Sequence, residues 1–476
     1  MIFNSIPFLI FFIVFYCIYL IVESKNYRHK LILAGSYFFY GWWDWRFLSL
    51  ILFSTIVDYI LGQKIYSESS VSKRKFFLRL SLLSNLGLLF VFKYFNFFVE
   101  SFMDIGTAMG LSPSMHTIQI ILPVGISFYT FQTLSYTIDI YWRKLKPESD
   151  FITFASYVSF FPQLVAGPIV RAVDLLPQFS LLQKITIEHI RIGLSLIVLG
   201  YFKKLVIADS LAPLIDDAFA YPMNYTSLNM MLVVVLYSMQ IYCDFSGYSD
   251  IAIGLGKLLG FDFPKNFNLP YFSRNFSEFW KRWHISLSNW LRDYLYIPLG
   301  GNRNGSLFTH RNLMITMLLG GLWHGANWTF VIWGFLHGLY LILQRWSKPM
   351  LGILCRPIPK PIVGLMGVLL TFVCVNFAWI FFRSQSLSEA LIIINKIGSL
   401  DSMSFNGLKP KFQLIQSMLV VLVLLSGELI YYFWKEKIDR ICREKIYLNV
   451  FVCAVMLWMI ILLGSFSNNN FIYFQF

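Results

Sequence analysis

The chain has 476 residues, of which 57% are hydrophobic, 18% aromatic and only 13% charged. Soluble globular chains carry about 25% charged residues, so this sequence cannot cover a water-facing surface of ordinary size. Its mean hydropathy of +0.62 agrees, and the composition predicts a polytopic membrane protein.

The formal net charge is +14, from 39 basic and 25 acidic side chains. In a soluble protein, such an excess would favour nucleic acid as a partner. Here the basic residues fall in short loops between apolar runs, which is typical of cytoplasmic loops in membrane proteins. We therefore expect the lipid bilayer as a partner and no nucleic acid. The six cysteines have no metal-type spacing, and no metal site is expected.

Apolar runs recur along the whole chain. Crossing ~30 Å of hydrocarbon takes about 20 apolar residues. Nine runs meet or approach this length: Ile6–Val22, Phe76–Phe98, Ile118–Trp142, Ile190–Val206, Leu228–Leu259, Trp328–Leu343, Pro361–Phe382, Leu414–Phe433 and Tyr447–Leu463. Others are shorter or interrupted by Gly and Pro: Leu31–Tyr40 with Phe47–Leu61, Phe151–Val170 and Asn312–Trp323. The predicted fold class is all-α, with roughly 10–12 membrane segments, some interrupted or re-entrant.

The charges of the loops predict how the chain is oriented. Basic residues follow the first apolar run, in Glu23–Lys30, which is the reverse of a cleavable signal peptide. We expect that run to remain as the first span, with the N-terminus outside. The loops Gln63–Lys75 and Arg143–Lys146 are also basic and are expected in the cytoplasm, whereas Tyr94–Tyr141 contains no Lys or Arg. No internal repeat or linker is evident, so a single membrane-embedded domain, residues 1–476, is predicted.

Ionisable residues inside apolar segments are costly, and they mark either paired groups or functional sites. Seven of them stand in such a context: Asp58, Asp139, Asp244, Asp250, His324, His337 and Glu428. Asp58 and Glu428 are isolated in otherwise bland spans, so a basic or amide partner is expected for each. His337 is interpreted as structural.

The segment Phe276–Tyr296 has the pattern of an amphipathic helix, with aromatic residues and leucines at spacings of three and four and with Lys and Arg among them. Trp with Arg and Lys on one helix suits the bilayer interface. His284 lies near its middle, next to Trp283 and one helical turn before Ser288. Two interpretations remain open: a hydrogen-bonded interface histidine, or a member of a catalytic or substrate-positioning site.

His324 is the strongest catalytic candidate. It lies in the apolar run 317–328 between glycines, which permit an irregular helix of the kind that lines cavities at membrane depth. It follows Arg311 by 13 residues, which corresponds to about 20 Å of helix, past the membrane midplane. There, a neutral imidazole can take a proton from a hydroxyl arriving from outside while an acyl donor approaches from the cytoplasm. The alternative is a core histidine bonded to a backbone carbonyl.

Other chemistries find less support. The chain has no G-x-S-x-G and no H-E-x-x-H sequence, which disfavours covalent serine catalysis and a zinc site. A transporter or flippase, with Asp244 and Asp250 on a translocation path, remains an alternative of another class, although such proteins commonly contain a structural repeat.

Several segments resemble the membrane-bound O-acyltransferase family, and most closely its bacterial alginate O-acetyltransferase branch. They are LPVGISFYTFQTLSYTIDIY (122–141), FFPQLVAGPIVR (160–171), YCDFSGYSDIAIG (242–254), RNFSEFWKRWHISLSNWLRDYLYIPLGGNR (274–303), GGLWHGANWTFVIWGFLHG (320–338) and FAWIFFRS (377–384). The likeness covers a motif-bearing core of about residues 37–384, with weaker similarity in the C-terminal spans 385–476. It implies the family fold, with a tunnel or funnel through the membrane.

The resemblance also implies roles for individual residues. The family's catalytic histidine corresponds to His324, and its accompanying active-site histidine corresponds to His284. Trp323 and Asn327 would line the tunnel. Trp283 and Ser288, beside His284, are expected in the same substrate site. No cofactor is expected to be bound permanently; acetyl-CoA or another activated acyl donor would be a substrate.

The predicted activity is therefore O-acylation, most simply O-acetylation, of hydroxyl groups on an extracytoplasmic cell-envelope polysaccharide such as alginate or peptidoglycan. The resemblance implies a multi-pass protein of the bacterial inner membrane and a separate periplasmic esterase-like partner that completes the transfer. D-alanyl transfer to teichoic acid and acylation of a lipid or peptide acceptor remain alternatives.

Overall fold

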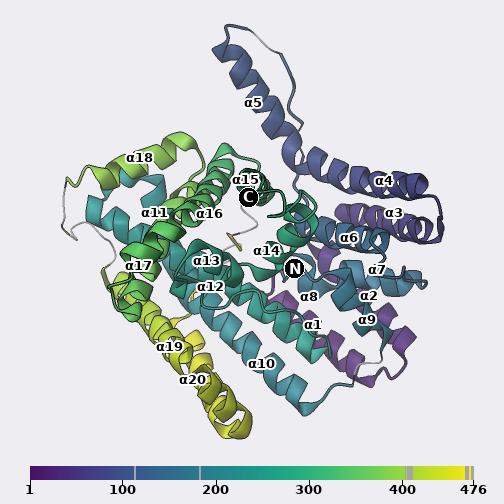
Figure 1. Cartoon of the computed structure of the whole chain (residues 1–476). Helices are drawn as coiled ribbons and strands as arrows, with labels where there is room; N and C mark the ends of the chain where they lie inside the picture. Colours follow the sequence, from purple (N-terminus) through teal and green to yellow (C-terminus); the bar gives the residue numbers. More distant parts are fainter. Residues whose placement is uncertain are drawn as a thin grey trace. The chain divides into compact units, whose positions relative to one another are not determined.

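The computed structural model describes residues 1–111, 114–118, 120–181, 184–401, 404, 411–466 and 471–472, and every regular element in this part of the chain is a helix (Figure 1). The all-α prediction is confirmed. The predicted C-terminal spans, 385–476, lie partly outside the described residues. The chain divides into two compact units: unit 1 is Met1–Leu194 with Ala252–Pro264, and unit 2 is Ser195–Ile251 with Lys265–Phe476.

The described residues contain six helical stretches that are long and apolar enough to cross a membrane. They are Lys25–Ser67, Val71–Ala108, Ser227–Leu258, Lys360–Arg383, Met418–Cys442 and Ile446–Leu463. The first predicted span, Ile6–Val22, contains a shorter apolar helix, Ile6–Ile21. The chain is therefore a multi-pass membrane protein. Among the other predicted runs, Trp328–Leu343 lies in the long helix Trp328–Leu354, whereas Phe151–Val170 forms short, interrupted helices.

Unit 1 is built from the N-terminal helices: α1 (Ile6–Ile21), α2 (Lys25–Asp44), η1 (Trp45–Phe47), α3 (Leu48–Ser67), α4 (Val71–Leu89), η2 (Phe90–Tyr94), α5 (Phe95–Ala108), α6 (Ile126–Tyr141), α7 (Phe151–Ser159), α8 (Phe161–Leu164), α9 (Ala172–Ser180) and most of α10 (Ile187–Tyr201). Helices α3, α4 and α6 pack on one another, and α2 packs on α7 (Figure 1). Helix α6 begins later than the predicted run from Ile118, because Gly125 adopts a left-handed backbone (φ 77°) directly before it.

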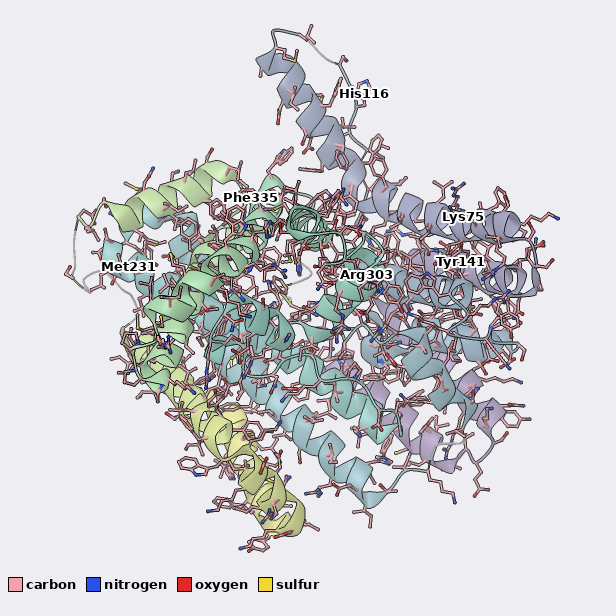
Figure 2. All side chains as sticks on the ribbon, in the orientation of Figure 1. Lys75, His116, Tyr141, Met231, Arg303 and Phe335 are labelled. Atoms are coloured by element: carbon pink, nitrogen blue, oxygen red, sulfur yellow. The ribbon has the colours of Figure 1, made fainter. Side chains whose placement is uncertain are left out.

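The two basic loops predicted to share the cytoplasmic side lie at the same end of unit 1. Arg143 Nη1 donates a hydrogen bond to the Tyr66 carbonyl at 2.7 Å, and Arg74 donates to the Tyr141 carbonyl. Lys75 and Tyr141 mark this end of α4 and α6 in Figure 2. Which side of the membrane this end faces stays a prediction.

Unit 2 contains the remaining helices: η3 (Phe202–Ala208), α11 (Asp209–Ala220), η4 (Pro222–Asn224), most of α12 (Ser227–Leu258), η5 (Pro270–Phe272), α13 (Phe276–Arg282), α14 (Ile285–Leu291), η6 (Arg292–Tyr296), α15 (Ser306–His324), α16 (Trp328–Leu354), α17 (Lys360–Arg383), α18 (Leu387–Gly398), α19 (Lys411–Glu444) and α20 (Ile446–Leu463). Helices α15 and α16 approach so closely that a Cβ on Gly321 would lie 2.2 Å from the Phe330 carbonyl oxygen. A Cβ on Gly334 would lie 2.3 Å from the Met317 carbonyl oxygen. Glycines therefore allow this helix pair to form.

The prediction of one continuous helix over Phe276–Tyr296 is wrong. Helix α13 ends at Arg282, His284 adopts a left-handed backbone (φ 41°), and α14 begins at Ile285. The backbone N–H groups of Ile285 and Ser286 donate to Asn266 instead of to the preceding turn. Hydrogen bonds from outside the segment thus replace the helical ones at its centre, although the aromatic pattern suits a helix.

Candidate active site

His324 is the last residue of α15. The helix ends there because Gly325 takes an extended backbone (φ −157°). The imidazole is 4% exposed and lies among aromatic rings, with centroid distances of 5.0 Å to Trp333 and 5.3 Å to Phe382. His324 therefore lies at the break before α16, inside an aromatic enclosure.

His284 occupies the break between α13 and α14 and is fully buried. Its ring makes an edge-to-face contact with Phe245, with 4.6 Å between the ring centroids. It also stacks on the ring of Phe267, at 6.4 Å between centroids. An aromatic shell of this kind disfavours a charged imidazolium, so we treat the ring as neutral.

The two histidines, 40 residues apart in sequence, come together within unit 2. Their ring centroids are 6.4 Å apart, at an interplanar angle of 57°. Trp323 contacts both rings, at 6.1 Å from His284 and 5.1 Å from His324. Three residues predicted for the site thus form one cluster.

Asn266 is a member of this cluster that the sequence pattern did not reveal. It is 1% exposed, and its Oδ1 lies 3.2 Å from His284 Nδ1. It comes from the irregular segment between α12 and η5, which has neither the aromatic periodicity around His284 nor the apolar, glycine-flanked context of His324.

The other three predicted site residues make contacts that hold the local structure. Trp283 is 1% exposed and packs on Phe279 and Trp379, at 5.7 and 5.0 Å. Ser288 Oγ donates to the Trp283 carbonyl at 3.2 Å. Asn327 caps α16: its Oδ1 accepts from the Thr329 N–H at 2.9 Å, while its Nδ2 donates to the Gln385 carbonyl. Substrate contacts by these residues stay a prediction.

Comparison with known proteins identifies the family. Residues 145–354, which include both histidines, match the model of the membrane-bound O-acyltransferase family. A protein of Azotobacter vinelandii named "Probable alginate O-acetylase AlgI" is 43% identical over 391 residues, which cover 82% of this chain and 76% of that protein. The chain belongs to the membrane-bound O-acyltransferase family. It is therefore an acyltransferase.

Two further relatives of this acyltransferase have other acceptors in their names. The peptidoglycan O-acetyltransferase of Helicobacter pylori is 38% identical over 400 residues, covering 79% of this chain and 74% of that protein. The teichoic acid D-alanyltransferase of Streptococcus thermophilus is 28% identical over 284 residues, covering 54% of this chain and 68% of that protein.

The acyltransferase also has buried groups that were expected to be structural. Asp58 accepts from Ser81 Oγ at 2.6 Å and from Asn85 Nδ2 at 2.8 Å, which confirms the expected amide partner. Glu428 accepts a hydrogen bond from the Tyr242 hydroxyl, and the nearby charge of Lys203 supplies the expected basic partner.

Two lysines that the sequence analysis did not single out neutralise the aspartates of α12, of which Asp244 is buried and Asp250 is partly exposed. Lys203 pairs with Asp250 at 2.7 Å. Lys204 pairs with both Asp244 and Asp209, at 2.5 and 2.9 Å. This ion pairing explains why the carboxylates of α12 are tolerated in the interior, without the translocation path that the transporter hypothesis assigns to them.

Proposed function

We propose that this acyltransferase O-acetylates hydroxyl groups of an extracytoplasmic cell-envelope polysaccharide. The names of its relatives, which refer to alginate and peptidoglycan, support the reaction and the class of acceptor. The observation that carries the proposal is the buried pair of histidines with centroids 6.4 Å apart. Neutral imidazoles in a site that excludes water suit proton transfer during acyl transfer.

In the proposed mechanism, His324 takes the proton of the acceptor hydroxyl. The oxygen attacks the acetyl carbonyl carbon and forms the new C–O bond. With a thioester donor, the C–S bond breaks and the proton passes from His324 to the departing sulfur, so that the histidine returns to its starting state. His284 assists from the adjacent position.

The same proposal assigns a cellular arrangement. The enzyme lies in the bacterial inner membrane with its N-terminus outside, and acetyl-CoA or another activated acyl donor arrives from the cytoplasm. A periplasmic esterase-like partner completes delivery to the polymer. The basic loops that meet at one end of unit 1 support a shared cytoplasmic side for them.

The test measures alkali-labile acetate in purified envelope and exopolysaccharide fractions of a deletion strain complemented with each variant. Wild type should restore the acetate, and His324→Ala should not, at equal membrane abundance. His310→Ala is a matched control, because this histidine lies on the same helix and contacts Trp346 instead. Acetate that the deletion leaves unchanged would contradict the proposed reaction. Restoration by His324→Ala would remove this residue from the mechanism.

D-alanyl transfer is the second candidate, because one relative carries that activity in its name. The same hydrolysates should therefore also be assayed for D-alanine. Loss of D-alanine with unchanged acetate would favour this candidate.

A further inference from the structure

The side-chain amide of Asn266 has a defined orientation. One of its terminal atoms lies 3.2 Å from the backbone nitrogen of Ser286. Because a backbone N–H can only donate, this atom must be the carbonyl oxygen, Oδ1. The same oxygen accepts from Ser286 Oγ at 2.9 Å, and the opposite atom, Nδ2, donates to Ser249 Oγ at 3.1 Å.

That orientation determines the tautomer of His284. The ring nitrogen Nδ1 lies 3.2 Å from Asn266 Oδ1, and a carbonyl oxygen only accepts, so Nδ1 carries the proton. A neutral imidazole has one N–H, which leaves Nε2 with its lone pair. Nε2 is buried and has no hydrogen-bond partner among the described residues.

Asn266 also holds the backbone of His284. Its backbone carbonyl oxygen accepts from the Ile285 N–H at 2.9 Å, directly after the left-handed residue His284. A positive φ is uncommon for a residue other than glycine and persists only where the surroundings enforce it. Ring and backbone of His284 are thus held by one residue from a different segment.

We propose that Asn266 is a positioning residue: it holds His284 as the Nδ1–H tautomer and keeps the Nε2 lone pair available as a hydrogen-bond acceptor in the active site. A neutral His284 in this tautomer cannot donate to the oxyanion that develops on the acetyl carbonyl. It accepts a hydrogen bond from a substrate donor group. The role in catalysis rests on the proposed function, whereas the tautomer does not.

The tautomer is tested without any substrate. Full-length protein labelled with ¹⁵N-histidine is reconstituted in lipid, and the His284 resonances are assigned by their loss in His284→Gln. We expect a protonated Nδ1 and an unprotonated Nε2 in wild type, and loss of this single tautomer in Asn266→Ala. A protonated Nε2 in wild type would overturn the proposal even if the acetate assay succeeds. Conversely, failure of the acetate assay alone would affect only the proposed function.

Activity tests the positioning role. In the complemented deletion strain, Asn266→Ala should lower restored acetate by about 10–100-fold, by analogy with the effect of removing hydrogen-bond partners that orient metal-binding histidines. Asn266→Asp keeps an acceptor oxygen opposite Nδ1 and should recover part of the loss. Ser286→Ala is the matched control: it removes a hydroxyl from the same oxygen but leaves His284 untouched.

Two results would contradict the positioning role. One is full restoration by Asn266→Ala. The other is an equal loss in Asn266→Ala and Ser286→Ala, which would indicate a general structural effect. Membrane abundance and thermal unfolding of each variant identify a folding defect, and in that case the wild-type spectrum still decides the proposal.

Discussion

The two compact units each contain a buried polar cluster, and the two clusters are completed differently. In unit 1, both carboxylate oxygens of Asp58 accept hydrogen bonds, from Ser81 and Asn85. Asn85 Oδ1 in turn accepts from Ser54 Oγ at 2.6 Å and Thr133 Oγ1 at 3.1 Å. This cluster is satisfied by side chains of three helices, α3, α4 and α6.

In unit 2, only one of the two ring nitrogens of His284 has a hydrogen-bond partner among the described residues. Nδ1 has Asn266 as its partner, whereas Nε2 has none within the described part of the chain. A buried polar atom without a partner costs free energy, and a bound ligand that pairs with it offsets that cost. We infer that the Asp58 cluster joins helices and that the His284 cluster serves a ligand.

The largest expected effect is on activity. His284→Ala should lower the acetate restored per molecule of enzyme by about 10²–10⁴-fold, the contribution expected of a positioned proton-transfer group. The unfolding temperature in detergent should also fall, because the variant loses the Nδ1–Asn266 hydrogen bond and leaves a cavity among aromatic rings, so activity is compared per folded molecule. A stable, fully active variant would contradict the inference about this site.

The glycine contact beside His324 should affect stability and activity together. In Gly321→Ala, the new Cβ would meet the Phe330 carbonyl oxygen, so α15 and α16 must separate. Overpacking of this kind costs about 1–3 kcal/mol, and the shift would also displace His324, three residues along α15.

The control for this prediction is the neighbouring glycine. In Gly320→Ala, the added Cβ meets only the end of the Leu291 side chain, at 3.2 Å, so a small adjustment suffices. Thermal unfolding and acetate restoration should therefore separate the two variants. Equal behaviour would show that the closeness of α15 and α16 does not matter to the site.

In unit 1, activity per folded molecule should not depend on the buried cluster. Asp58→Ala leaves the Ser81 hydroxyl and the Asn85 amide without their acceptor, which should destabilise the protein by about 1–3 kcal/mol. Acetate restored per folded molecule should be retained. The isosteric Asp58→Asn, which keeps one acceptor, should lose less stability. A variant that folds stably but is inactive would show that Asp58 has a role in the reaction and not only in stability.

The sequence predicted the individual residues better than the contacts between them. Membrane segments and isolated polar residues follow from hydropathy, because the cost of burying charge is local to each segment. The break at His284 did not follow, since it depends on hydrogen bonds donated to Asn266, 18 residues earlier in an irregular segment. The ion pairs of Lys203 and Lys204 were missed for the same reason: their partners lie on another helix.

His337 provides the smallest and most selective test. It is fully buried, and it stacks on Phe279 at 6.0 Å and contacts Trp333 at 4.7 Å. Neither ring nitrogen has a hydrogen-bond partner among the described residues, so, unlike His284, it has no bond there that holds one tautomer. We therefore interpret it as a packing residue.

His337→Phe preserves the aromatic shape and removes two buried polar atoms, and replacement of this kind is nearly neutral or stabilising. The unfolding temperature should stay equal or rise, and acetate restoration should persist. Trp333 makes the result decisive, because it also contacts His324, at 5.0 Å. If His337→Phe folds but loses activity, a buried histidine without a hydrogen-bond partner is functional here. The hydrogen bond from Nδ1 to Asn266 would then not be the feature that distinguishes His284 from His337.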